Sequence, residues 1–297
     1  MTTALDELIA IVTPEPLGDD RFRGVGSRND GVDATFGGHF LGQAVAAAHA
    51  TVDGDQRIHS LHGYFLRAGR PDTPFDIEVE RLRDGFRFCH RRVRIGQEGT
   101  TQFELTASFT LDAEGPELRP TPPPDLDRLP SPESLPGYRA LMSSLDELPL
   151  PEAWARRDPG IDIRTISAPW APGGPSAQGG IRLWIRAVDA IPDDPGLHSA
   201  LLAYQSDESL ADTVAIPWGG TWGTPGVVFV SLDHAIWFHR PFDLNRWHLL
   251  DQRPVTVSGQ RGLATAEVWS TDGELVASVN QEALLRLSPD LVEGHHG

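Results

Sequence analysis

The chain contains no lysine, so all 25 of its basic residues are arginines, and 42 aspartates and glutamates outnumber them. The formal net charge is therefore −17. Nucleic acids and anionic membranes are bound mainly through clusters of Lys and Arg, so this balance argues against both as partners. A phosphorylated ligand is still compatible with it, because a few arginines around a pocket can hold phosphate groups through forked hydrogen bonds.

Cysteine is nearly absent, since Cys89 is the single one among 297 residues. One cysteine rules out an internal disulfide and a thiolate metal cage, and it fits a reducing compartment. No apolar run approaches the roughly 20 residues that a membrane-spanning helix needs. The first residues lack the basic start and apolar stretch of a signal peptide. We therefore expect a cytoplasmic protein with no membrane insertion, no metal and no cofactor.

An internal repeat is the most informative pattern that the chain does contain. The segment Tyr-Phe-Leu-Arg at 64–67 is echoed by Trp-Phe-His-Arg at 237–240, a shift of 173 residues. Gly99 is echoed by Gly273, a shift of 174. Polar residues are not repeated, because Ala107 stands where the second copy has Gln281. The repeat predicts two domains of one plan, of which one carries the chemistry and the other completes the architecture.

The first half reads as helices followed by antiparallel strands. Thr3 and Asp6 frame a capped amphipathic helix, and a second helix begins at 36–38 with small residues that allow close backbone packing. Period-two patterns and hairpin turns predict strands at 58–66, 75–83, 86–97 and 101–111.

The second half repeats this order after a proline-rich middle. Residues 113–178 hold 14 of the 25 prolines and are predicted to form a connection with a helix near 134–148. A strand at 181–186 and a helix at about 198–210 follow. Further strands are predicted at 227–238, 247–258, 262–270 and 274–287.

One helix followed by several antiparallel strands, twice over, is an α+β plan. An antiparallel sheet wrapped around a long central helix is the hotdog fold, and two such units side by side form a double hotdog. Pairing their sheets would also protect the edge strands. We therefore expect an N-terminal hotdog at 1–112, a proline-rich connection at 113–178, and a C-terminal hotdog at 179–297 that carries the catalytic residues.

Eight separated segments, in order along the chain, resemble the type II acyl-CoA thioesterase family, which has the double hotdog fold. They lie at 36–38, 41–44, 59–69, 82–85, 106–109, 202–207, 232–242 and 276–282. The resemblance spans most of the chain outside the proline-rich middle. It implies hydrolysis of fatty acyl-CoA to free fatty acid and CoA, by direct attack of an activated water.

The resemblance also assigns site residues. In that family an Asp on the second helix, a Thr or Ser on a central strand and a Gln on the last strand hold the attacking water. These roles fall on Asp207, Ser231 and Gln281, and Ser231 departs from the commoner Thr. The predicted substrate-binding residues are Gly37 and Gly38, which would leave room for acyl-CoA, and His59, which would contact the water or the acyl group. The alternative for His59 is a structural hydrogen bond within the sheet.

The same trio is chemically reasonable by itself. Asp207 could take a proton from water as a general base, while Ser231 and Gln281 hold that water toward the thioester carbonyl. Backbone N–H groups at a helix start or strand end would stabilise the oxyanion, although the sequence does not say which. The alternative is a non-catalytic tandem hotdog that binds acyl-CoA or acyl carrier protein. We expect a homo-oligomer in either case, because closed symmetry buries exposed sheet faces.

Overall fold

The computed structural model describes residues 2–26, 34–145, 152, 155, 157–171, 174–176 and 179–293. Its helices are α1 Ala4–Val12, α2 Gly37–His49, α3 Tyr138–Ser143, α5 Pro195–Ser206 and α6 Pro289–Glu293. The strands of the first half are β1 Glu15–Gly18, β2 Arg21–Gly24, β3 Gln56–Phe65, β4 Phe75–Asp84, β5 Phe88–Gln97 and β6 Thr100–Leu111. Those of the second half are β7 Ile161–Ser167, β8 Ile181–Ala187, β9 Val227–Ser231, β10 Asp233–Phe238, β11 His248–Ser258, β12 Arg261–Ser270 and β13 Leu275–Leu287.

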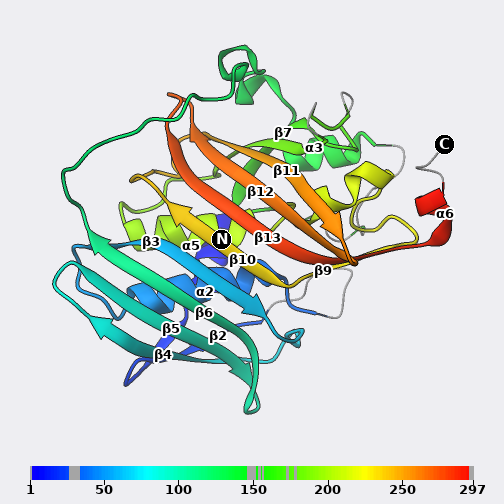
Figure 1. Ribbon diagram of the computed structural model, residues 1–297. Coiled ribbons are helices and arrows are strands. Elements are labelled where there is room, and N and C mark those ends of the chain that lie inside the picture. The colour runs from blue at the N-terminus through cyan, green and yellow to red at the C-terminus, as the bar shows by residue number, and fades with distance from the viewer. Residues whose placement is uncertain are drawn as a thin grey trace.

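All these strands belong to one antiparallel sheet, which runs through both halves of the chain (Figure 1). At its middle β3 pairs with β10, with Leu61 opposite Ile236. Outward from this seam, the order β3-β6-β5-β4-β2-β1 on one side is matched by β10-β13-β12-β11-β8-β7 on the other. The repeat seen in the sequence is therefore a repeat of topology.

The two glycines of the repeat occupy equivalent turns. Gly99 lies between β5 and β6, and Gly273 lies between β12 and β13. Both have left-handed backbone angles, with φ of 77° and 81°, which glycine adopts without steric cost. The hairpins predicted at 97–99 and 271–273 are thus confirmed.

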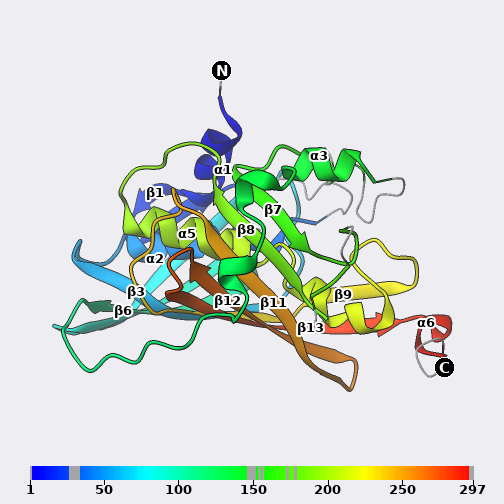
Figure 2. The same cartoon turned by 90° about the horizontal axis from the view of Figure 1, so that it is seen from above.

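Helices α2 and α5 pack against each other on one side of the sheet, as the view from above shows (Figure 2). Their close approach depends on glycines one turn apart in α2. A Cβ on Gly38 would lie 2.5 Å from the carbonyl oxygen of Tyr204, and one on Gly42 would lie 3.3 Å from that of Ala200. For Gly42 this confirms the prediction that small residues of this helix allow close backbone packing.

The start of the chain adds a third helix to this layer. Thr3 and Asp6 form the reciprocal hydrogen bonds of a capping box at the start of α1, as predicted. Leu5, Leu8 and Val12 of α1 are buried in the same core as α2 and α5. None of the helices in the described residues is long and apolar enough to cross a membrane.

The proline-rich connection crosses the opposite face of the second half. Ile181, Leu183 and Ile185 of β8 point into the main core, so Trp184 faces the other way and donates a 3.0 Å hydrogen bond from Nε1 to the carbonyl of Pro130. There it joins an apolar cluster made by two further tryptophans and residues of the connection. Its members include Trp184, Trp247, Leu249, Trp269, Leu126, Leu129 and Leu135.

Several elements differ from the prediction. The connection contains β7, a strand that we did not predict because prolines at 159 and 169 frame it. Strands β1 and β2 were also not predicted. The helix expected near 134–148 is realised as the short α3, and residues 146–148 lie outside the described residues. The single strand expected at 227–238 is two strands, β9 and β10, separated at Leu232.

Candidate active site

Asp207 lies where α5 ends. Helix α5 begins at a strong cap, because Asp194 accepts hydrogen bonds from the N–H groups of Gly196 and Leu197 and Pro195 occupies the first turn. Asp207 is the C-cap, one residue beyond the last helical residue, rather than a residue within the helix as predicted. It is 8% exposed. Its carboxylate accepts a hydrogen bond from the backbone N–H of Gly38, at the start of α2.

Gln281 of β13 connects the other two predicted catalytic residues, Asp207 and Ser231. Its amide nitrogen Nε2 donates to Asp207 Oδ1 at 2.6 Å and to Ser231 Oγ at 2.8 Å. Ser231 is the last residue of β9 and pairs with Ala283, two residues after Gln281. The Gln281 side chain is fully buried, and its Oε1 has no hydrogen-bond partner in the described part of the chain. The side chains of Asp207, Ser231 and Gln281 therefore converge, as their predicted roles require.

His234 is a fourth member of this group that the sequence analysis missed. It is fully buried in β10, and its Nδ1 lies 3.8 Å from Asp207 Oδ1. Its Nε2 lies 2.9 Å from Ser206 Oγ. Burial lowers the pKa of His234 to about 3, so the imidazole is neutral. The signal that could have revealed it is the repeat, because His234 lies 173 residues after the apolar Leu61.

The burial of Asp207 sets its acidity. Removal from water disfavours the charged carboxylate and raises the pKa of Asp207 to about 7, although the hydrogen bonds from Gln281 and Gly38 oppose the shift. A carboxyl group with a pKa near neutrality can accept a proton during a reaction and release it afterwards. This is the property expected of a general base that operates near pH 7.

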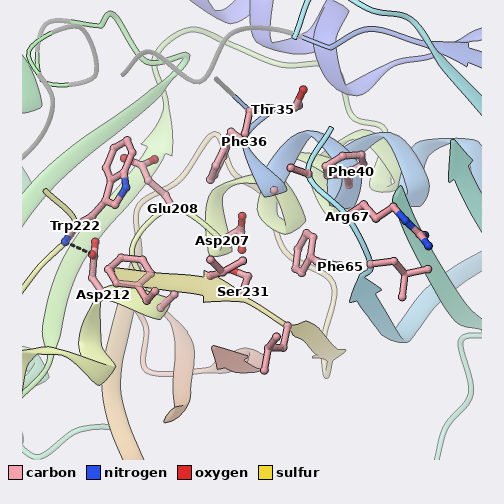
Figure 3. Close-up of a pocket in the computed structure, with 18 residues that line it drawn as sticks. Thr35, Phe36, Phe40, Phe65, Arg67, Asp207, Glu208, Asp212, Trp222 and Ser231 are labelled. Carbon is pink, nitrogen blue, oxygen red and sulfur yellow. Dashed lines mark hydrogen bonds between the residues drawn. The ribbon is translucent and has the colours of Figure 1, made fainter. Parts of the chain in front are cut away.

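A cavity of about 570 Å³ opens beside Asp207 and Ser231 (Figure 3). Aromatic side chains form much of its wall, including Phe36, Phe40, Phe65, Trp222 and Phe229. Such a volume is within the range of small-molecule sites.

Of the two glycines predicted to leave room for the substrate, Gly37 lies at this cavity and Gly38 does not line it. Gly37 lines the cavity, and a Cβ at this position would collide with Asp207 Oδ2. Gly38 supplies the N–H that binds Asp207. The absence of side chains at the start of α2 thus lets the helix backbone approach the carboxylate directly.

His59 does not join this group. Its Nε2 lies 2.8 Å from Ser108 Oγ, and its ring lies edge-on to Phe88, at a centroid distance of 5.8 Å. It is not among the residues that line the cavity. Its predicted contact with water or substrate therefore has no geometric support here. In the described residues we also find no group of three or more His, Cys, Asp or Glu side chains arranged to hold a metal ion.

Comparison with known proteins places this geometry in a family. A family model described as acyl-CoA thioesterase matches residues 170–284, and one described as acyl-CoA thioesterase N-terminal domain matches residues 26–110. A solved hot dog fold protein of unknown function from Alicyclobacillus acidocaldarius superposes with a TM-score of 0.75. It is 20% identical and covers 97% of this chain and 100% of its own. At that identity the likeness concerns the fold alone.

Two other proteins are similar in sequence over nearly their whole length. Acyl-CoA thioesterase 2 of Haemophilus influenzae is 33% identical over 293 residues, which cover 97% of this chain and all of that protein. The crystal structure of the acyl-CoA thioesterase II TesB2 from Mycobacterium marinum is 34% identical, has a TM-score of 0.75, and covers 97% of this chain and 98% of its own. The chain therefore belongs to the acyl-CoA thioesterase family, which confirms the resemblance identified in the sequence.

Proposed function

We propose that this protein hydrolyses fatty acyl-CoA to free fatty acid and CoA by direct attack of a water that Asp207 activates. The observation that carries the proposal is the buried bridge made by Gln281, whose Nε2 holds Asp207 Oδ1 and Ser231 Oγ at 2.6 and 2.8 Å beside the cavity. Membership of the acyl-CoA thioesterase family supports the substrate class.

The three side chains would divide the work as follows. Both hydrogens of the Gln281 amide can be used by Asp207 and Ser231, so Gln281 orients these two groups instead of binding the water itself. The water would lie between Asp207 Oδ2, on the side of Gly37, and the Ser231 hydroxyl. Holding the water in one place and one orientation lowers the entropic part of the barrier.

In the reaction Asp207 takes a proton from the water as its oxygen bonds to the carbonyl carbon of the thioester. The oxyanion that forms needs hydrogen-bond donors, and we infer that the N–H of Gly37 is one. This N–H lies in the first turn of α2, where N–H groups have no partner inside the helix, and Gly37 lines the cavity. The carbon–sulfur bond then breaks, and the CoA thiolate takes the proton back from Asp207.

Release of free CoA from a panel of straight-chain acyl-CoAs tests the proposal. Asp207→Asn should keep the fold and lower kcat by about 10²-fold or more, the scale of a lost general base. Asp272→Asn is a matched control, because Asp272 lies in the β12–β13 turn with its side chain 65% exposed. Wild-type turnover by Asp207→Asn would refute the mechanism. Tight binding of acyl-CoA with no release of CoA by the wild type would instead favour the non-catalytic alternative.

We infer further that the two halves form the double hotdog predicted from the sequence, with α2 and α5 as its central helices. The mirrored strand order and the packing of α2 on α5 support this architecture. The predicted divisions at 112–113 and 178–179 remain predictions, and β7, which lies within the predicted connection, pairs with β8 of the C-terminal unit. A cytoplasmic location remains a prediction based on the single cysteine.

A homo-oligomer also remains a prediction. Tyr64 of β3 and Trp237 of β10 are 52% and 43% exposed beside the central seam of the sheet, and association would cover such side chains. Light scattering should therefore show a dimer or larger assembly, and a single species of the 32.4 kDa monomer mass at micromolar concentrations would contradict it.

A further inference from the structure

Asp212 is a second buried carboxyl group in the wall of the same cavity. It lies in the short helix η3 Ala211–Val214, is 5% exposed, and lines the cavity together with Asp207. Its Oδ1 accepts a 2.8 Å hydrogen bond from the backbone N–H of Trp222, drawn in Figure 3. Within the described residues, Trp222 supplies the one hydrogen bond to this carboxyl group, and that bond is to Oδ1 and not to Oδ2. The catalytic mechanism above makes no use of this group.

The position of Asp212 within the cavity indicates what it would meet. Figure 3 shows Asp207 and Ser231 between Asp212 and Trp222 on one side and Phe65 and Arg67 on the other. Leu66, beside Arg67, is 48% exposed, whereas Asp212 is 5% exposed. The CoA moiety is large and charged and must remain near solvent. The acyl chain would therefore extend past Asp207 toward Asp212.

We propose that Asp212 determines acyl specificity, and that the acyl group it selects carries a hydroxyl on the part of the chain beyond the thioester. A plain hydrocarbon chain would cover Oδ2 and leave a buried polar atom without a partner, which is costly. A hydroxyl would donate a hydrogen bond to this atom. The inference rests on the proposed function in that it takes acyl-CoA as the ligand.

The charged side chains near Asp212 favour an acyl chain whose hydrogen-bond donor is neutral. Glu208 lines the same part of the cavity, but its carboxylate is already bound by Arg157 and by Gln205 Nε2, the latter at 2.7 Å. Burial raises the pKa of Asp212 to about 7, and the negative charge of Glu208 adds to the shift. A second carboxylate, at the end of a dicarboxylic acyl chain, would be repelled here.

Binding of non-hydrolysable thioether analogues of acyl-CoA, measured by calorimetry, tests the inference without requiring turnover. The analogues form three series of graded chain length that end in methyl, hydroxyl or carboxylate. At lengths that reach Asp212, the wild type should bind the hydroxyl analogue about 10-fold tighter than the methyl analogue, the scale of one buried hydrogen bond to an ionisable group. It should bind the carboxylate analogue more weakly than either.

Two variants make the test specific. Asp212→Leu should reduce the hydroxyl-to-methyl affinity ratio to about 1 by removing the acceptor. Asp212→Asn keeps an oxygen for the Trp222 N–H and a polar group for the ligand, so it should retain part of the ratio. Asp272→Asn, in the exposed turn, should leave it unchanged.

Equal wild-type affinity for the hydroxyl and methyl analogues at every chain length would overturn the inference. This measurement uses the wild type alone, so it does not depend on whether a variant folds. An equal change in both affinities in Asp212→Asn would overturn it as well. Either result together with normal CoA release would leave the proposed function intact. A clear hydroxyl preference without CoA release would refute hydrolysis and not the role of Asp212.

Discussion

The N-terminal and C-terminal halves of this chain share one strand order but differ in the residues at four matched positions. The C-terminal half places Asp207, Ser231, His234 and Gln281 there. The N-terminal half has Ala50, Ile58, Leu61 and Ala107 at these positions, of which Ala50 is exposed and the other three are buried. The first member of each set is the C-cap of the central helix, of α5 and α2 respectively.

For the other three positions, the counterpart in the N-terminal half is identified from the register of the paired strands. Ser231 pairs with Ala283, and Ile58 pairs with Phe109, the residue 174 positions before Ala283. Likewise Leu61 pairs with Ala107, which lies 174 positions before Gln281. The same fold therefore accepts either an apolar or a polar set at one place.

The difference shows what a group of buried polar side chains requires of this fold. Burying polar side chains costs free energy unless each finds a partner. The C-terminal half meets this cost with the bridge from Gln281 to Asp207 and Ser231, and it still leaves Gln281 Oε1 unpaired. The N-terminal half avoids the cost at the strand positions matched to these, where it has the apolar side chains of Ile58, Leu61 and Ala107. Under the proposed function one such set is enough for the chemistry, so a second would add instability with no necessary gain.

Replacing Gln281 by its N-terminal counterpart, Gln281→Ala, should have the largest effect after the loss of Asp207 itself. Asp207 and Ser231 would lose their common donor, and hydrogen bonds to charged groups are worth about 1.5–3 kcal/mol, or roughly 10- to 100-fold in kcat. Steady-state CoA release measures the loss, and Gln281→Glu separates shape from donor capacity. Full activity of Gln281→Ala would mean that the bridge is not needed.

Ser231→Ala should cost less, about 10-fold in kcat, because the water would keep its bond to Asp207. Ser231→Thr preserves the hydroxyl and should retain most of the activity. Intact-mass spectrometry during turnover provides the decisive check on the role of Ser231. A loss as large as that of Asp207→Asn, together with an acyl adduct in the wild type, would identify Ser231 as a nucleophile instead.

The converse change, Ala107→Gln in the N-terminal half, should leave kcat nearly unchanged and lower stability. Ala107 is 1% exposed, so the larger polar side chain would be forced into a packed region without partners there, at a cost of about 1–3 kcal/mol in the free energy of unfolding. Urea denaturation gives the stability and CoA release gives the activity. A gain of activity would show that the N-terminal half can also be made catalytic.

Much of this arrangement could be predicted from the sequence, because it depends on local signals. Repeated glycines and alternating strands indicated the duplication, and the eight matched segments indicated Asp207, Ser231 and Gln281. Strand β7 was missed because its alternation is short and framed by prolines, and its assignment depends on pairing with the distant β8.

The residues of the site that escaped prediction depend on tertiary contacts. His234 lies in a matched segment without an assigned role there, and its position against Asp207 follows from the pairing of β10 between β3 and β13. Asp212 gave no signal beyond an acidic residue in an apolar stretch. In contrast, His59 has a prominent place in a matched segment, and the structure directs its ring to Ser108.

The pH dependence of kcat/KM tests most directly the claim that Asp207 is the general base of the single catalytic half. Its pKa is raised to about 7 by burial, and the carboxylate is the active form. The rate of the wild type should therefore fall about 10-fold per pH unit below pH 7 and level off above it. In Asp207→Asn the remaining rate should lose this acid limb. Persistence of the same limb in Asp207→Asn would show that another group activates the water and would contradict the account.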